Sequence, residues 1–163
     1  AYIKRISAVE THPLRRDVLG WIRCHGSLSL QEDALPSTTH WGCFLNQQTH
    51  AVPVGVVTLI DHPFVAESDG EINHINALPQ WQLRGMAVDN AHQGQGLGGL
   101  LLAAVIRHVK TEKQQTGLWA NARDKAVRCY ERQGFVVVGE PFDIPLIGQH
   151  FQMIYQGDTG SYE

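Results

Sequence analysis

The segment with the clearest chemical potential is glycine-rich and lies near the middle of the chain, Gln93-Gly94-Gln95-Gly96-Leu97-Gly98-Gly99. Four glycines within six residues let the backbone curl so that several N–H groups point the same way. An amphipathic helix is predicted to follow, and its N-terminus adds roughly half a positive charge. Such a turn can hold a diphosphate without lysines. A turn that needs only positive φ angles is the plain alternative, but it requires fewer glycines.

Two other phosphate-binding patterns fit this segment less well. Gly94, Gly96 and Gly99 have the spacing of the dinucleotide fingerprint, which leaves a nicotinamide-dependent enzyme as one interpretation. However, five residues separate the glycines from the predicted strand end at Val88, and the next strand does not end on an acidic residue. The Walker pattern is excluded because no Lys-Ser or Lys-Thr pair follows the glycines.

The elements around this turn are the most strongly patterned in the sequence. Residues 81–88 have the character of a strand, and apolar residues recur at i, i+3, i+4 and i+7 from Gly96 onward, which predicts a helix that ends near Thr116-Gly117. Residues 118–122 follow as a short strand. A strand, a helix and a strand in this order predict a parallel, right-handed unit.

The rest of the chain predicts shorter elements around that unit. Leu14, Val18, Trp21 and Ile22 form one apolar stripe, which predicts a single helix from about Thr11 to Gly26. We also expect strands at 2–8, 41–46, 52–60, 135–139 and 150–155, and a polar turn at 47–50 that joins the strands at 41–46 and 52–60. The other expected segments are a loop or one short helix at 27–39, an irregular excursion at 61–78, a helix at 123–133 and a frayed tail at 157–163. The fold class is therefore α+β, with a mixed, mostly antiparallel sheet, one parallel βαβ unit and flanking helices, in one domain over residues 1–163.

The amino-acid composition argues against nucleic acid, membrane and metal partners. The 163 residues carry a formal net charge of −3 and no basic excess, which argues against a nucleic acid partner. No apolar run approaches the roughly 20 residues needed to cross a bilayer, and the first residues do not resemble a signal peptide, so we expect a cytoplasmic protein without a membrane partner. The three cysteines have no disulfide or zinc spacing, and the nine histidines are dispersed, so no metal site is expected. The four tryptophans are expected in the core.

The motif set as a whole resembles the GNAT acetyltransferase superfamily. The residues that carry the resemblance are Leu83-Arg84-Gly85-Met86-Ala87-Val88, Gln93-Gly94-Gln95-Gly96-Leu97-Gly98, Asn121-Ala122-Arg123, Ala126, Tyr130 and Gly134-Phe135. The likeness is specific over about residues 81–135, and the order of the predicted elements extends it to nearly the whole chain.

The resemblance implies an acetyl-CoA-dependent N-acetyltransferase and assigns roles to particular residues. The superfamily pattern that binds the diphosphate falls on Gln93, Gly96 and Gly98, and the preceding strand would contact the pantetheine arm through its backbone. Tyr130 occupies the general-acid position, and Arg123 stands where many members carry Asn, with Asn121 two residues earlier. The implied contacts with acetyl-CoA are Met86, Ala87, Val88, Gln93, Gly94, Gln95, Gly96, Leu97, Gly98, Gly99, Asn121 and Tyr130.

The sequence leaves the acceptor and the general base open. An alkylammonium is neutral in only about one molecule in 2,500 at pH 7, so a base or a desolvating pocket is useful. The groups that could serve or orient an acceptor are Glu32, Asp33, Glu67, Asp69, Glu71, His74 and Arg84, and each is equally explained as a surface charge. Arg123, Lys125 and Arg128 are candidates for a contact with the ribose phosphate.

Three functional alternatives follow from these residues. We expect transfer of an acetyl group to a primary amine of a small molecule or a protein. A coenzyme A-binding module or sensor without turnover is the alternative, and the nicotinamide-dependent enzyme is the third. Exposed strand edges near the C-terminus would permit a homodimer.

Overall fold

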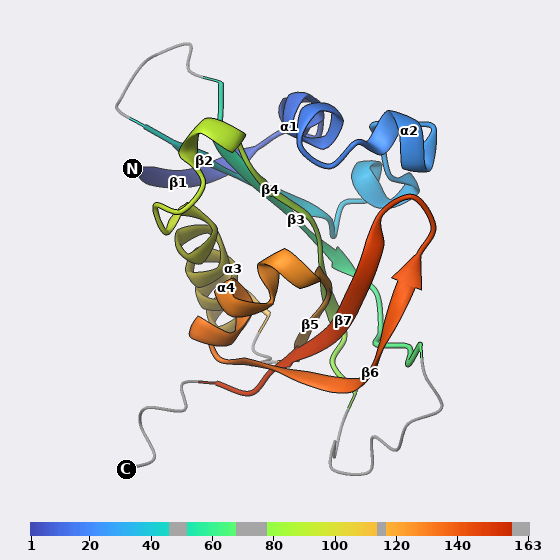
Figure 1. The fold of residues 1–163 in the computed structure, drawn as a ribbon. Coiled ribbons are helices and arrows are strands. Elements are labelled where there is room, and N and C mark those ends of the chain that lie inside the picture. The colour runs from blue at the N-terminus through green and yellow to red at the C-terminus, as the bar shows by residue number, and fades with distance from the viewer. Residues whose placement is uncertain (46–51, 68–77, 114–116, 158–163) are drawn as a thin grey trace.

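The backbone forms one seven-stranded sheet with helices on both faces (Figure 1). The structure is a computed structural model, and it describes residues 1–45, 52–67, 78–113 and 117–157. The strands are β1 (Tyr2–Ile6), β2 (Thr39–Phe44), β3 (Gly55–Asp61), β4 (Trp81–Val88), β5 (Leu118–Arg123), β6 (Phe135–Ile144) and β7 (Gly148–Tyr155).

The sheet has the order β1-β2-β3-β4-β5-β7-β6, and it confirms the predicted mixed topology. All neighbouring strands run antiparallel except β4 and β5, which are parallel. The connection between those two strands contains the helix α3 (Leu97–Glu112), as the sequence predicts. The predicted turn at 47–50, most of the excursion after β3 and the C-terminal tail from residue 158 lie outside the described residues.

The remaining helices are short and divide between the two faces of the sheet. Leu101 and Val105 of α3 pack with Leu59 and Leu83 on one face. Leu14 packs with Val56 and Ala87 on the other. The short helices besides α3 are α1 (His12–Asp17), α2 (Trp21–His25) and α4 (Val127–Arg132). There are also 3-10 turns at Val9–Thr11, Gln31–Ala34, Asn90–His92 and Asp124–Ala126.

The prediction of one helix from Thr11 to Gly26 is wrong. Gly20 adopts φ +66° and separates α1 from α2, so the chain changes direction between them. The apolar stripe is consequently split: Trp21 is buried, whereas the side chain of Ile22 is 55% exposed. The periodicity of the apolar residues indicated helix correctly, but a glycine in the left-handed region ends the first helix early.

Two boundaries in the second half of the chain also differ from the prediction. The helix expected at 123–133 begins later, because β5 continues through Arg123 and a 3-10 turn precedes α4. The strand expected at 135–139 extends to Ile144. Its pairing with β7 resumes at Phe142 after an irregularity that follows Val138, and Gly139 and Pro141 in this stretch hide the strand from pattern analysis.

An extra residue interrupts β4 and changes which face its side chains occupy. Val56 pairs with Ala87 and Thr58 pairs with Arg84, so two residue steps on β3 oppose three on β4. Gly85 lies within this bulge and adopts φ +61°. Trp81 and Leu83 before the bulge, and Met86 and Val88 after it, all pack in the cluster that α3 covers.

The centre of the molecule is apolar, as expected. All four tryptophans are less than 10% exposed. No helix in the four described ranges is long and apolar enough to cross a bilayer.

Candidate active site

The glycine-rich turn presents backbone amides at the start of α3. Gly94 and Gly96 both adopt φ +79°, and an added Cβ at either position would meet nothing within 4 Å. Gly96 is the N-cap residue of α3, and no side chain caps the helix. The first N–H groups of α3 therefore remain available to an external acceptor, as helix geometry requires when no cap is present.

Two further glycines of the turn allow α3 to approach its neighbours closely. A Cβ at Gly98 would lie 3.1 Å from the Sγ of Cys129, and one at Gly99 would lie 3.1 Å from the Nε2 of Gln133. A side chain at either position would require Cys129 or Gln133 to shift, so these two glycines allow close packing, a role separate from the turn itself.

Gln93 holds the turn with its own side chain. Its Nε2 donates to the carbonyl oxygen of Val88 at 3.0 Å and to the Oδ1 of Asn90 at 3.2 Å. The side-chain amide therefore ties the end of β4 to the start of the glycine segment. Gln93 was predicted to contact a diphosphate, and its position at the cavity wall is compatible with that prediction.

A cavity of about 720 Å³ opens beside this turn, where β4 and β5 separate. The two strands pair only from Trp81 to Leu83 on β4, and from Leu118 to Ala120 on β5. Beyond that point β4 continues without a partner on this side, so the backbone of residues 85–88 borders the cavity. The bulge at Gly85 and the parting of the strands thus leave N–H and C=O groups on the β4 edge for a ligand.

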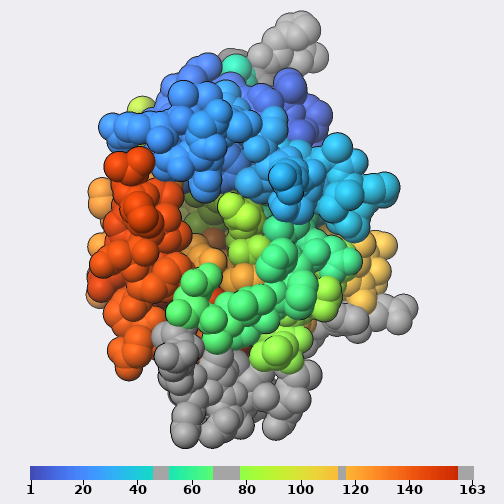
Figure 2. All heavy atoms as spheres, turned by 90° about the vertical axis from the view of Figure 1, so that its right-hand side faces the viewer, coloured from blue at the N-terminus to red at the C-terminus, as the bar shows by residue number. Residues whose placement is uncertain are grey.

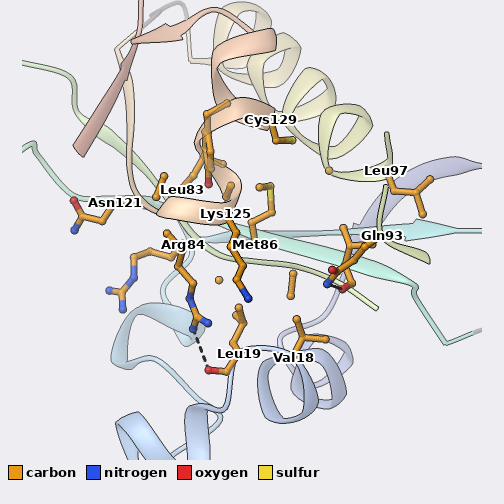
Figure 3. Close-up of a pocket in the computed structure, with 18 of the residues that line it drawn as sticks. Val18, Leu19, Leu83, Arg84, Met86, Gln93, Leu97, Asn121, Lys125 and Cys129 are labelled. Carbon is orange, nitrogen blue, oxygen red and sulfur yellow. Dashed lines mark hydrogen bonds between the residues drawn. The ribbon is translucent and has the colours of Figure 1, made fainter. Parts of the chain in front are cut away.

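The cavity gathers nearly all of the residues singled out in the sequence. The predicted residues that line it are Met86, Ala87, Val88, Gln93, Gly94, Gly96, Leu97, Gly98, Gly99, Asn121 and Tyr130. Gln95 is exposed and is not part of the lining. In Figure 3, Gln93 and Leu97 lie at one end of the cavity and Asn121 and Arg84 at the other, with Met86 and Lys125 between them.

Tyr130 is a buried phenol in the cavity wall. Its side chain is only 4% exposed, and its ring packs edge-on against Phe135 with 5.1 Å between the centroids. Burial, with a smaller contribution from Cys129, raises the pKa of Tyr130 well above its ordinary value. The hydroxyl is therefore protonated throughout the physiological pH range, as a proton donor must be.

The opposite end of the cavity is bordered by segments far apart in sequence. Leu19, between the N-terminal helices, and Ile144 and Ile147 of the β6–β7 hairpin line the cavity, whereas Val18 lies nearer to Gln93 in Figure 3. Figure 2 shows a hollow between the N-terminal helices, this hairpin and the segment after β3, with β4 at its floor. We name the end with Asn121 and Arg84 the acceptor end, and the end at the glycine-rich turn the phosphate end, after the sequence predictions for Arg84 and for the glycines.

Asn121 lines the cavity at the acceptor end and is hydrogen-bonded to Gln152. Its Oδ1 accepts a hydrogen bond of 3.2 Å from the Nε2 of Gln152, and the Oε1 of Gln152 accepts one of 2.8 Å from the backbone N–H of Glu67. The other acidic candidates of the excursion, Asp69 and Glu71, lie outside the described residues, as does His74.

Of the three basic residues near the start of the later helix, two line the cavity. Arg123 and Lys125 border it, whereas Arg128 is exposed and does not. The Nη2 of Arg123 donates to the carbonyl oxygen of Leu19 at 3.0 Å, which links β5 to the N-terminal helices. Because Arg123 is on a strand rather than at a helix start, it faces the acceptor end together with Asn121.

A buried ion pair behind the acceptor end was not found by sequence analysis. Arg15 is completely buried, and its Nη1 and Nη2 donate to the two carboxylate oxygens of Asp33 at 2.7 and 3.1 Å. The same guanidinium donates to the Oγ1 of Thr58 at 2.9 Å and lies 4.5 Å from the ring of Trp21. An added Cβ on Gly85 would lie 3.3 Å from that ring, so Trp21 fills the space beside the bulge.

His40 completes this network. Its Nδ1 is 2.7 Å from the Oγ1 of Thr58, the same hydroxyl oxygen that accepts a hydrogen bond from Arg15. Burial dominates the charge interactions and lowers the pKa of His40. Burial alone would raise the pKa of Asp33, but the hydrogen bonds from Arg15 and the Leu30 amide outweigh it, and the pKa is lowered. No signal of this network is present in the sequence, because the burial of Arg15 is visible only in the structure.

Comparisons with known proteins agree on one family. A family model described as an acetyltransferase (GNAT) domain matches residues 57–147. The uncharacterized N-acetyltransferase YitI of Bacillus subtilis is 28% identical over 157 residues, covering 93% of each protein.

Solved structures agree in fold at low sequence identity. An acyl-CoA N-acyltransferase of Pseudomonas aeruginosa has a TM-score of 0.66 at 16% identity, with 95% of this chain and 99% of that chain covered. The enzyme AAC(6')-Ib, in complex with ribostamycin and coenzyme A, has a TM-score of 0.61 at 19% identity, with 94% and 91% covered.

Proposed function

The chain belongs to the GNAT acetyltransferase family, and from this premise we propose that it transfers the acetyl group of acetyl-CoA to a primary amine of a small molecule or a protein by direct attack on the thioester. The family is one of N-acetyltransferases that use acetyl-CoA, and related structures hold coenzyme A. The observation that carries the proposal is the single cavity in which the uncapped amides of α3, the open edge of β4 and the buried Tyr130 meet.

The residues at the phosphate end fit coenzyme A. The left-handed glycines of the turn leave open space in front of amides that no side chain caps, and a diphosphate accepts hydrogen bonds from such groups. Gly94, Gly96, Gly98 and Gly99 would hold the diphosphate, and the β4 edge from Met86 to Val88 would hold the pantetheine arm. Because Gly98 and Gly99 lie close to Cys129 and Gln133, we expect this end to change little on binding.

When bound, acetyl-CoA supplies an acetyl thioester whose C–S bond breaks as the bond from the acceptor nitrogen to the acetyl carbon forms. Tyr130 holds a proton at its hydroxyl oxygen and passes it to the departing sulfur, then regains one from solvent. A backbone N–H between Met86 and Val88 donates to the acetyl oxygen as negative charge develops there. The acceptor amine gives up its protons to solvent.

The electrostatics of the cavity assist the acceptor in losing its proton. Arg84, Arg123 and Lys125 line the wall, and nearby positive charges disfavour the ammonium form of an amine. Burial of the amine in the cavity also disfavours its charged form. We therefore assign no side chain as a dedicated base.

The match to an acetyltransferase family favours coenzyme A over a nicotinamide dinucleotide, the other interpretation of Gly94, Gly96 and Gly99. It equally favours an enzyme over a coenzyme A-binding module without turnover. No observation of the site favours either alternative.

The test is release of free thiol from acetyl-CoA across a panel of amines and peptides, with Tyr130→Phe as the variant. We expect its kcat to fall about 10²- to 10⁴-fold with little change in coenzyme A affinity, because a single proton donor is removed. Tyr155→Phe is the matched control. This tyrosine is also buried, its ring centroid lies 5.4 Å from that of Phe135, and it is not part of the wall of this cavity. Equal rates for Tyr130→Phe and the unmodified protein would overturn the role of Tyr130, and no thiol release with any acceptor would overturn the function.

A further inference from the structure

At the acceptor end, Arg84 has no hydrogen-bonded partner among the residues that the structure describes. Arg84 is the last residue of β4 before the bulge, it is half-buried, and it lines the cavity. Among the described residues its guanidinium makes no hydrogen bond and no ion pair. Arginine carries five N–H donors in a planar fork, so a large hydrogen-bonding capacity is left unused here.

The nearby carboxylates do not satisfy Arg84. Burial lowers the pKa of Arg84, and the negative charges of Glu32 and Asp33 only partly oppose that effect. Asp33 already receives both Nη atoms of Arg15 and the backbone N–H of Leu30. Glu32 acts on Arg84 through space without an ion pair. A half-buried cation without a hydrogen-bonded anion is unfavourable, which indicates that a ligand supplies the anion.

Arg123 adds a second guanidinium at the same end. A single hydrogen bond, from its Nη2 to the carbonyl oxygen of Leu19, is its only one within the described parts of the chain, and its remaining donors are unused. Burial lowers the pKa of His25, and the charges of Arg84 and Arg123 lower it further. Arg84 and Arg123 therefore both act on His25, and all three residues line the cavity.

The charged side chains that line the cavity are all basic among the described residues. Within the described residues, the lining includes Arg84, Arg123, Lys125 and Arg132 and contains no aspartate or glutamate. The diphosphate end does not account for Arg84, because Figure 3 places Arg84 and Asn121 at the opposite end from Gln93 and Leu97. A neutral or cationic acceptor would leave these guanidinium groups without compensation.

We propose that the acceptor is a small primary amine that also carries a carboxylate, and that Arg84, with Arg123 beside it, binds this carboxylate while the amine faces the acetyl group. The inference rests on the proposed acetyl transfer and names the class of its acceptor. A planar fork and a carboxylate can form two parallel hydrogen bonds, which fix the orientation of the acceptor as well as its charge. Polyamines such as aminoglycosides are expected to be poor acceptors because like charges would meet.

The experiment compares matched acceptors. The common L-amino acids are assayed against their carboxamides and their decarboxylated amines, with O-phosphoethanolamine and ethanolamine as a phosphate pair and ribostamycin as a polycation. We expect kcat/KM to be highest for a carboxylate. In Arg84→Gln, KM for that carboxylate is expected to rise about 10- to 100-fold, because a charge-assisted hydrogen bond is lost. KM for its carboxamide and for acetyl-CoA should stay nearly unchanged.

Arg107→Gln is the control for net charge, because Arg107 is exposed on α3 and is not part of this cavity. It should leave all constants unchanged. Arg84→Lys retains the charge without the fork and should recover only part of the preference. Arg123→Gln should raise KM for the carboxylate less than Arg84→Gln does.

Several results would overturn the inference. One is equal kcat/KM for a carboxylate and its carboxamide. Another is a higher kcat/KM for O-phosphoethanolamine or for ribostamycin than for any carboxylate. A third is an equal rise in Arg84→Gln of KM for the carboxylate and of KM for its carboxamide. Absence of thiol release with every acceptor would instead count against the acetyl transfer. Calorimetric titration of the same amino acids and carboxamides into the coenzyme A complex then tests Arg84 without turnover, and equal affinities for the two would overturn the carboxylate site.

Discussion

The two ends of the cavity use different parts of the polypeptide. At the phosphate end, backbone amides of one continuous segment are left without a side-chain cap, and glycines leave open space beside them. At the acceptor end, side chains from β4, β5 and the N-terminal helices converge, and a buried ion pair supports them. The first end depends on local backbone conformation and the second on tertiary structure. Substitutions should therefore affect the two ends separately.

The largest effect should come from Arg15→Met at the acceptor end. Asp33 would lose both charged hydrogen bonds while its side chain is only 8% exposed. Removing one partner of a buried pair costs about 3–5 kcal/mol, so we expect urea unfolding at neutral pH to report a loss of this size in the free energy of unfolding.

Arg16→Met is the matched control on the same helix. Arg16 pairs with Asp17 on the surface, both side chains are more than half exposed, and no measurable loss is expected. If the two variants lose equal stability, the network does not support the acceptor end as described. Folded Arg15→Met should retain coenzyme A affinity and show a raised KM for the acceptor.

Gly96→Val should damage the phosphate end alone. A β-branched residue at φ +79° is strained by roughly 1–2 kcal/mol, and relief of that strain turns the amides away from the diphosphate. We expect the dissociation constant for coenzyme A, measured by calorimetry, to rise about tenfold or more, which corresponds to one charge-assisted hydrogen bond. Gly26→Val places the same residue at φ +71° outside the cavity, so it should lose similar stability and keep its affinity.

Gln93→Ala should have a smaller effect at the same end. The substitution removes the two hydrogen bonds to Val88 and Asn90, each worth about 0.5–1.5 kcal/mol at most on an exposed side chain. We expect a rise of a few-fold in KM for acetyl-CoA and no change in KM for the acceptor. Gln95→Ala, two residues away and outside the lining, should change neither constant, and an equal change in both variants would contradict the role of Gln93.

The smallest effect concerns the protonation of His40. Burial lowers the pKa of His40 below its ordinary value near 6.5, so the unfolded chain binds its proton more readily than the folded protein. The stabilising contribution is complete above pH 6.5 and is lost as the pH falls through the folded pKa. We expect urea unfolding between pH 8 and pH 5 to show declining stability, and His40→Gln to decline less steeply. Parallel slopes for the two proteins would show that other histidines carry the effect.

The local structure of the phosphate end could be predicted from the sequence because its determinants are contiguous. Gly94, Gly96 and the apolar period of α3 lie within one strand, turn and helix, where local rules determine the structure. The parallel pairing of β4 with β5 followed from the same unit. Resemblance to a known family added Tyr130, which no local rule indicates.

The acceptor end could not be predicted because its contacts are distant in sequence. Arg15 meets Asp33 across 18 residues and Thr58 across 43, and Arg123 meets Leu19 across 104. Periodicity located the N-terminal helix but not its interruption at Gly20. The extension of β6 was hidden because only the partner strand β7 makes a continuous strand from a segment that contains Gly139 and Pro141.

The inserted residue in β4 exchanges the roles of odd and even positions along that strand. Arg84 lines the proposed acceptor end, whereas Met86, only two positions later, packs in the cluster that α3 covers. Under the proposed function, this one strand would contact both the acceptor and acetyl-CoA. Substitutions ahead of Gly85 can alter which amine is accepted while the thioester remains in place, whereas deletion of a single residue at the kink would turn Met86 and Val88 toward the N-terminal helices and disable both tasks at once.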